Sequence, residues 1–238
     1  MSLRHQLTIV IPCKNEVNYI GKTLLSLNEQ SGIEGVDVIV ADARSTDGTL
    51  DLLKDLNKSK TLKYRLHIIN GGRVAVGRNR GASFLKRDYI VFIDADTTFS
   101  SRFTIQHTFD LLDRYDLVTC NFESRSSSLL SKWAFKLFNV VRNNLMKEPF
   151  AVGAYFATRR DAFERYGRFD ETVMHTEDYL LSRKYNPEKF AVVLSSTATQ
   201  DDRRFKRMGY LKFLGMMVMN YLNRNNLEYF RKDIKYWD

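Results

Sequence analysis

The stretch "VFIDADTTF" (91–99) joins an apolar run to two carboxylates that lie one residue apart. The three apolar residues that open it are typical of a buried strand, and Asp94 and Asp96 follow at its carboxyl end. Two like charges at such close range cannot both stay ionised without compensation. A hard divalent cation supplies that compensation, so both carboxylates are candidates for a metal and phosphate site. The alternative for the tripeptide alone is that one aspartate caps a helix and the other is solvated.

Further apolar runs precede and follow this stretch, at 7–13, 36–42, 64–69 and 117–122. The segments between them have helical periodicity or capping residues, at 17–30, 47–56, 73–87 and 101–114. This alternation predicts an α/β fold with a mostly parallel central sheet that helices flank on both faces. Because ligands of such sheets bind at the carboxyl ends of strands, Asp42 is expected on the same rim as Asp94 and Asp96.

The alternation weakens after residue 123, where the pattern predicts an amphipathic helix at 128–147, a strand at 151–158 and a helix at 206–223. We expect a single domain over residues 1–238. Its expected parts are a nucleotide-sugar-binding half at 1–122, an acceptor and catalytic half at 123–202, and a C-terminal helical extension at 203–238.

The composition is basic, with 37 Lys and Arg against 28 Asp and Glu, a formal net charge of +9. Such an excess favours an anionic partner: nucleotide phosphates, a lipid headgroup surface or nucleic acid. No nucleic-acid module signature is present, so we predict no nucleic-acid partner, with a basic nucleic-acid-binding module as an alternative function. Cys13 and Cys120 lie in apolar runs and are expected to be reduced thiols of a cytoplasmic protein. We expect neither a secretory leader nor a spanning helix.

Several segments occur in the order found in family 2 glycosyltransferases, which the chain resembles from about Leu7 to Arg207. The segments are "TIVIPCKNE", "VIVADARSTDGT", "GRNRGA", "YIVFIDADTTF", "GAYFATRRDAFERYGRFDE" and "TEDYLLSRK". The resemblance implies the GT-A fold, with a Rossmann-like nucleotide-binding half and an acceptor-binding half. It also implies an inverting transfer of sugar from a nucleoside-diphosphate sugar, linked to UDP or GDP, to a hydroxyl acceptor.

The resemblance further assigns roles to individual residues. Nucleotide-binding positions, including the diphosphate-side Arg78, correspond to Pro12, Asn15, Glu16, Asp42, Arg78 and Asp94. Asp94 and Asp96 match the D-x-D motif that ligates Mn²⁺ or Mg²⁺, and Asp178, beside Glu177, matches the catalytic base. A carboxylate suits the N–H edge of uracil or guanine. For the acidic pair, the alternative is that two acids in a first helical turn only favour the helix dipole.

The chain also departs from the family pattern. Ala43 and Arg44 stand where a second Asp and a Gly are common, so Arg44 is a candidate contact to donor or acceptor. His175 is a candidate acceptor contact, or else a surface or supporting residue. Arg203 and Arg204 are candidates to close over the diphosphate, or else form a solvated basic face.

The processive-synthase motif Gln-x-x-Arg-Trp is absent, which favours a single transfer onto a lipid-linked or polysaccharide precursor. A sugar-nucleotide pyrophosphorylase is the alternative enzyme, because it shares the architecture and the paired carboxylates. The chain lacks the Gly-rich loop that such an enzyme places after the first strand.

Two amphipathic segments raise the question of a membrane. Residues 203–226 place an apolar stretch between basic residues, which favours contact with the inner face of the cytoplasmic membrane. Residues 128–147 mix aromatic and basic side chains, and we expect them to pack on the core or in a homodimer.

Overall fold

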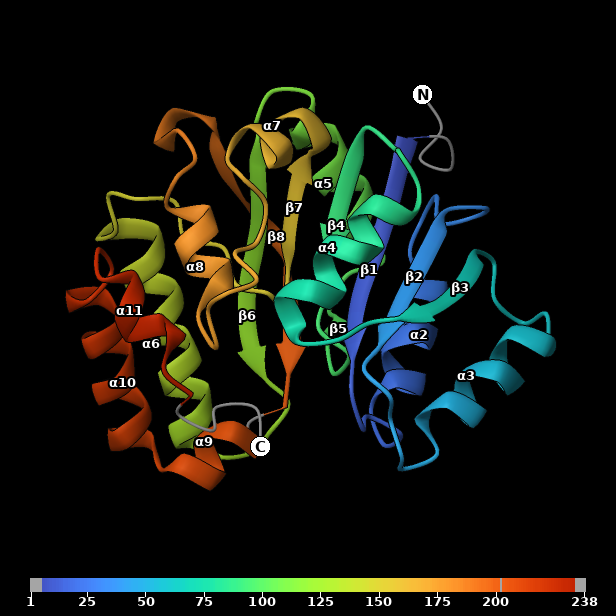
Figure 1. The fold of residues 1–238 in the computed structure, drawn as a ribbon, viewed down its shortest axis with the longest axis horizontal. Coiled ribbons are helices and arrows are strands. Elements are labelled where there is room, and N and C mark those ends of the chain that lie inside the picture. Colours follow the sequence, from blue (N-terminus) through green and yellow to red (C-terminus); the bar gives the residue numbers. More distant parts are fainter. Residues whose placement is uncertain (1–5, 202, 234–238) are drawn as a thin grey trace.

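The computed structural model describes residues 6–201 and 203–233, and these form a central eight-stranded sheet with helices on both faces (Figure 1). The order of strands across the sheet is β3-β2-β1-β4-β7-β6-β8-β5. The strands are β1 (Leu7–Cys13), β2 (Asp37–Asp42), β3 (Arg65–Asn70), β4 (Tyr89–Phe92), β5 (Thr98–Phe99), β6 (Leu117–Ser124), β7 (Phe156–Arg159) and β8 (Phe190–Gln200).

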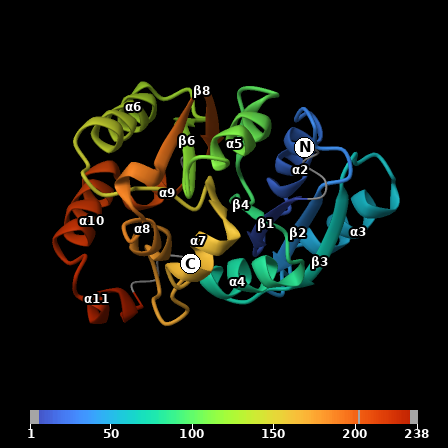
Figure 2. The same cartoon turned by 90° about the horizontal axis from the view of Figure 1, so that it is seen from above.

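Helices cover both faces of this sheet. Seen from above, α2, α5 and α6 lie on one face and α4, α7 and α8 on the other, while α10 and α11 lie at the end away from β3 (Figure 2). The helices are α2 (Ile20–Asn28), α3 (Thr49–Lys58), α4 (Val74–Phe84), α5 (Thr104–Leu112), α6 (Leu129–Asn144), α7 (Arg160–Arg165), α8 (Glu177–Ser182), α9 (Arg203–Met208), α10 (Tyr210–Leu222) and α11 (Leu227–Arg231), with a 3₁₀ turn at Pro187–Lys189.

The predicted, mostly parallel sheet is confirmed, and each of its antiparallel pairs includes β7 or β8. Strands β3, β2, β1 and β4 pair in parallel, as does β6 with β8. Strand β7 runs antiparallel between β4 and β6, and β5 pairs antiparallel with β8. The carboxyl ends of β1, β2 and β4 therefore open on one edge.

The first strands are apolar throughout because both of their faces are buried. In β1, Ile9 and Ile11 belong to the core that packs under α2, while Val10 belongs to the second core, on the α4 side. All three side chains are fully buried. A strand covered on both faces therefore reads as a continuous run rather than an alternation.

Two predicted elements differ from the structure. The strand expected at 151–158 begins only at Phe156, because the residues before it form a turn with an isolated bridge between Val152 and Tyr155. The helix expected at 206–223 is divided at Gly209, whose φ of 81° lies in the left-handed region. The chain changes direction there between α9 and α10.

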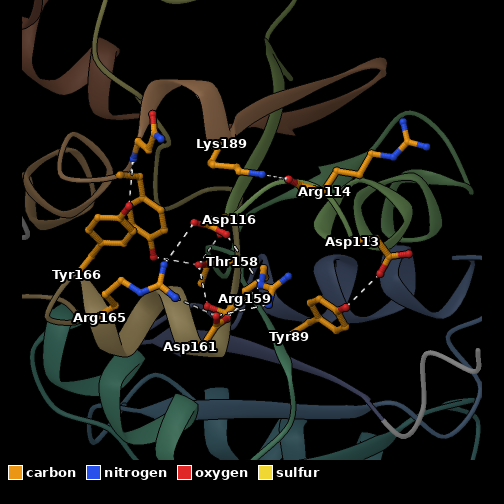
Figure 3. Close-up of polar contacts among 12 residues, drawn as sticks. Tyr89, Asp113, Arg114, Asp116, Thr158, Arg159, Asp161, Arg165, Tyr166 and Lys189 are labelled. Carbon is orange, nitrogen blue, oxygen red and sulfur yellow. Dashed lines mark hydrogen bonds and ion pairs between the residues drawn. The ribbon is translucent and has the colours of Figure 1, made fainter.

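A network of ion pairs fixes α7 at the edge of the sheet opposite to these carboxyl ends (Figure 3). Asp161 accepts from Arg159 Nε at 3.0 Å and from Arg165 Nη2 at 3.2 Å, and Asp116 lies 3.9 Å from each of the two guanidinium groups. Thr158 Oγ1 donates to the carbonyl oxygen of Asp116 at 2.8 Å. Two carboxylates balance two guanidinium groups, so the network is structural.

The helix predicted at 128–147 is α6, and its inner face packs on the sheet. Phe135 is buried, Phe138 packs against Phe122, and Arg142 Nη1 donates to the carbonyl oxygen of Cys120 at 2.8 Å. Within the described ranges, no helix combines the length and apolarity needed to cross a bilayer.

Candidate functional site

The loops after β1 and β2 are interlocked by hydrogen bonds. The Asp42 carboxylate accepts from Ser45, at 2.9 Å from its backbone nitrogen and 2.5 Å from its hydroxyl. Asn15 N–H donates to Ser45 Oγ at 2.8 Å, and Asn15 Oδ1 accepts from Thr46 N–H at 2.9 Å. Asn15 has a φ of 54°, a left-handed conformation that Asn tolerates. Asn15 and Asp42 thus belong to one polar constellation.

The remaining predicted residues of these two loops lie around that constellation. Pro12 pairs with Ala41 across β1 and β2. Glu16 begins the turn into α2, and its backbone N–H donates to Thr49 Oγ1 at 2.9 Å. Arg44 is exposed and has a φ of 60°. Its contact with a donor or acceptor remains a prediction.

Arg203, at the start of α9, joins the loops after β1 and β4. Its Nη2 lies 2.5 Å from Glu16 Oε1 and 3.2 Å from Asp96 Oδ2. Its guanidinium carbon lies 4.5 Å from the centre of the Tyr19 ring, a cation–π contact. Arg203 therefore lies at the predicted nucleotide rim, with 43% of its side chain still exposed. The side chain of Arg204 is outside the part of the chain that the structure describes.

Arg78 is the most deeply buried charge of the site, with 1% of its surface exposed. Nη2 donates to Asp94 Oδ1 at 2.8 Å, and Nη1 donates to Glu177 Oε1. The guanidinium carbon lies 5.2 Å from the centre of the Phe169 ring. Arg78 thus connects α4, the end of β4 and α8. Its expected contact with a diphosphate remains a prediction, because both of these nitrogens bind carboxylates in this structure.

The turn before β7 supports the acidic pair. Asp178 Oδ2 accepts from the backbone N–H of Gly153 at 2.6 Å, and Oδ1 accepts from that of Tyr179 at 2.7 Å. A Cβ atom at position 153 would lie 1.8 Å from Arg78 Nη2, so only glycine fits beside the buried guanidinium.

Burial separates the roles of the two acids. Desolvation raises the pKa of Glu177 and of Asp178, and the Arg78 guanidinium opposes this rise. The Glu177 side chain is 4% exposed and bound by Arg78, whereas Asp178 is partly exposed. Asp178 therefore keeps some contact with solvent whereas Glu177 is enclosed, and the role of Asp178 as the base remains a prediction.

Asp94 and Asp96 provide oxygen ligands but no complete cage. Among the described residues, no group of three or more His, Cys, Asp and Glu side chains is arranged to hold a metal ion. The Asp96 carboxylate already faces one cation, the guanidinium of Arg203, and Arg78 binds only Oδ1 of Asp94. Mg²⁺ sites commonly combine one or two carboxylates with substrate phosphates. The donor set thus fits a cation that a diphosphate would help to hold.

His175 is fully buried, so its expected place at the surface is wrong, whereas the alternative of a supporting residue is compatible with its burial. Its ring lies 5.8 Å from that of Tyr229 and 5.3 Å from that of Phe230, and Nδ1 lies 2.9 Å from Thr176 Oγ1. Burial lowers the pKa of His175, which favours the neutral ring. The residue helps to attach α11 beside α8.

A pocket of about 330 Å³ lies beside Glu177, between α8 and the C-terminal helices. Its lining includes Arg183 and Arg224, which lie 3.3 and 3.7 Å from the carboxylate of Glu148. The carboxylate of Glu148 offsets part of their charge, and Glu177 is the residue that this pocket shares with the acidic pair.

Four residues of the site were not predicted. Ser45 binds Asp42, Tyr19 stacks on Arg203, and Gly153 binds Asp178. Arg125 Nη2 donates to the carbonyl oxygen of Asp96 at 2.8 Å. Ser45 and Gly153 lie inside the segments that resemble the family, so the sequence marks their surroundings as functional. Tyr19 and Arg125 lie outside those segments, and nothing in the sequence marks them.

The fold and this constellation define a GT-A glycosyltransferase. The profile of "Glycosyl transferase family 2" matches residues 8–167, and the chain belongs to this family. The match ends before the acidic pair of α8.

Over 113 residues, the chain is 32% identical to the uncharacterised glycosyltransferase YfnE of Bacillus subtilis. The match covers 48% of this chain and 29% of YfnE. It is 32% identical over 93 residues to the poly(ribitol-phosphate) beta-glucosyltransferase of Bacillus spizizenii, covering 38% and 15% of the two chains. The matched region thus spans less than a third of each relative.

A solved structure has the same fold. The mannosyltransferase PcManGT of Pyrobaculum calidifontis, in complex with GDP-Man and Mn²⁺, superposes with a TM-score of 0.67 at 21% identity. The superposition covers 89% of this chain and 64% of PcManGT.

Replacing Arg78 by Met should destabilise the protein by about 3–5 kcal/mol, because breaking a buried ion pair leaves its partner charged and unpaired. Chemical denaturation followed by circular dichroism measures this loss. Adding Glu177→Gln should recover part of it, since one uncompensated carboxylate is removed. The control is Lys54→Met, which breaks an exposed pair with Asp51 and should change little. Equal losses of stability for Arg78→Met and Lys54→Met would contradict the anchoring role of Arg78.

Gly153→Ala should cost about 1–3 kcal/mol, because the new methyl group must displace the buried guanidinium of Arg78. Gly215→Ala is the matched control: it lies in α10 and a Cβ there meets no atom within 4 Å. That change should be neutral or stabilise by up to about 1 kcal/mol. Thermal unfolding of both variants tests the difference, and an unaffected Gly153→Ala protein would show that the close packing at this turn is wrong.

Proposed function

We propose that the chain transfers one sugar, with inversion, from a nucleoside-diphosphate sugar to a hydroxyl acceptor. The observation that carries the proposal is the convergence of acidic side chains from separate loops on one sheet edge. Glu16 and Asp96 share Arg203, while Asp94 and Glu177 share Arg78. This arrangement offers a donor side and an acceptor side that are held rigidly together.

On the donor side, the loops after β1 and β2 would bind the nucleotide. Asp42 is buried and holds Ser45, and its oxygens have the acceptor capacity that the N–H edge of uracil or guanine requires. Pro12 and Asn15 would line the base, with Glu16 beside them. PcManGT binds GDP-Man, but its 21% identity leaves the choice between UDP and GDP open for this chain.

On the acceptor side, Asp178 would take the proton of the attacking hydroxyl. Backbone N–H groups hold both of its oxygens, which fixes the carboxylate without neutralising it. Glu177 would act through Arg78 rather than on the substrate. A general base aligned in this way is the chemistry that an inverting displacement needs.

Asp96 and Asp94 would hold Mn²⁺ or Mg²⁺ together with the diphosphate. When bound, such a cation offsets the negative charge that grows on the leaving diphosphate. Arg203 is the side chain best placed to add a second positive charge there.

The acceptor that we favour is a lipid-linked or polymeric precursor of the cell envelope. One relative is named as a glucosyltransferase of poly(ribitol-phosphate), and the chain carries a net charge of +9, which suits an anionic acceptor or surface. Peripheral attachment to the inner face of the cytoplasmic membrane is part of this proposal.

Asp178→Asn should retain donor binding and lower the transfer rate by about 10²–10⁴-fold, because the amide cannot accept a proton. Calorimetry with UDP and GDP, followed by assay of sugar release, separates binding from transfer. Asp51→Asn, on the exposed face of α3, is the control. Normal turnover by Asp178→Asn would refute the assignment of the base.

The rate should also fall as the pH is lowered. Only the ionised carboxylate is a base, and burial raises the pKa of Asp178 and of its neighbour Glu177. The acid limb of kcat/KM should therefore lie above the ordinary aspartate pKa of about 3.9 and report the coupled pair. A rate that stays constant down to the ordinary range would contradict the raised pKa.

Mn²⁺ should stabilise the protein mainly when a nucleoside diphosphate is present, because the protein alone offers two carboxylates. At a ligand concentration a hundredfold above its dissociation constant, the stabilisation should reach about 2.7 kcal/mol. Thermal shift with UDP or GDP, with and without Mn²⁺, measures this. Asp96→Asn should lose the metal-dependent part, and Asp51→Asn should keep it. An equal effect of Mn²⁺ without nucleotide would contradict the shared site.

A further inference from the structure

The outer face of α6 is an exposed apolar stripe. Trp133 and Leu137 are 65% and 57% exposed, and Leu129 and Val140 continue the stripe toward the two ends of the helix. These residues recur every three or four positions, so they share one side of the helix. The opposite side, with Phe135, packs on the sheet. The helix is therefore anchored by one face and presents the other to its surroundings.

Helix α10 presents a similar face. Leu214, Val218 and Leu222 are spaced four residues apart and are 53%, 51% and 65% exposed. Figures 1 and 2 both show α10 beside α6, at the end of the molecule away from β3. The outer sides of these two helices are here called the α6–α10 surface. Large apolar side chains are exposed along it, and such exposure is typical of a surface that binds a partner or a membrane.

Exposed basic side chains lie along both helices. Neither α6 nor α10 contains an acidic residue, and Lys132, Lys136 and Lys212 are exposed on them. Acidic residues such as Glu148 lie beyond the helix ends. Within the stripe itself, Lys136 Nζ lies 5.2 Å from the centre of the Trp133 ring. Long basic side chains beside an exposed indole are typical of a helix that lies at a membrane interface.

We propose that the α6–α10 surface docks on an anionic lipid bilayer. Apolar side chains would enter the boundary between headgroups and acyl chains, and the surrounding lysines and arginines would meet lipid phosphates. A second copy of the chain is disfavoured as the occupant, because a symmetric contact would bring the exposed lysines of both copies together.

This docking would orient the proposed active site. Arg203 contacts Glu16 and Asp96 at the nucleotide rim, and α9 leads directly from it to α10. A docked α10 would hold the rim near the lipid surface, where a lipid-linked acceptor is found. This consequence rests on the proposed function, whereas the docking itself does not.

The test uses Trp133 as its own probe. The chain has two tryptophans, and Trp237→Phe leaves Trp133 as the single one in the full chain. Vesicles of phosphatidylglycerol and phosphatidylcholine, at low salt and without donor or acceptor, should shift its emission to the blue. Bromine labels on the acyl chains should quench it. Vesicles of phosphatidylcholine alone should have a much weaker effect, and high salt should reverse the shift because it screens the basic residues.

Matched variants locate the surface. Leu137→Asp and Val218→Asp should weaken vesicle binding about tenfold or more, since each removes an apolar contact and adds a repelled charge. Leu25→Asp is the control, because Leu25 is 50% exposed on α2, outside this surface. Circular dichroism confirms that each variant is folded.

Three outcomes would overturn the proposal. Trp133 emission could stay unchanged with anionic vesicles, or Leu25→Asp could lose as much binding as Leu137→Asp. The emission could also be blue-shifted without vesicles and vary with protein concentration, which would assign the surface to a second copy. The proposed transfer is judged separately, because the vesicle assay involves no chemistry.

Discussion

The buried guanidinium of Arg78 and its two carboxylate partners form the constraint on which the site depends. A charge with 1% exposure would cost several kcal/mol in isolation, and this one is tolerated because its two nitrogens meet Asp94 and Glu177. The same bonds allow two carboxylates to lie close together at the end of β4 and the start of α8. The lack of a side chain at Gly153 completes the arrangement, because any Cβ there would enter the space of the guanidinium. The shape of the catalytic rim is thus set by charge compensation as much as by packing.

The sequence predicts the first half of the fold well, for a physical reason. Strands buried on both faces need continuous apolar runs, and β1, β2 and β4 have them, so the rim with Asp42, Asp94 and Asp96 follows from the parallel order. The second half departs from this rule: β7 is short and antiparallel, and Gly153 in the turn before it packs closely against Arg78, far away in the chain. No local pattern contains that information. The break at Gly209 likewise interrupts a stretch whose helical periodicity is continuous in sequence.

The division of labour between Glu177 and Asp178 illustrates what only tertiary structure can decide. Both are acids in the first turn of α8, and the helix dipole favours both equally. The partner of Glu177 is 99 residues away in the chain, and the bond to it removes that carboxylate from any substrate. Asp178 instead receives two backbone N–H groups and keeps some exposure. The family resemblance implies that Asp178 is the base, and the partial exposure of Asp178 is compatible with that prediction.

Arg203 connects the charge balance of the rim with the C-terminal helices. Its guanidinium compensates both Glu16 and Asp96. Under the proposed function, a cation that arrives with the donor would take over the compensation of Asp96, and the donor phosphates would offer Arg203 a new anionic partner. The cation would keep Asp96 compensated, so this carboxylate would avoid the cost of an isolated ion. Because Arg203 begins α9, and α9 leads into α10, the same exchange would act on the helix whose exposed apolar face we assign to the bilayer.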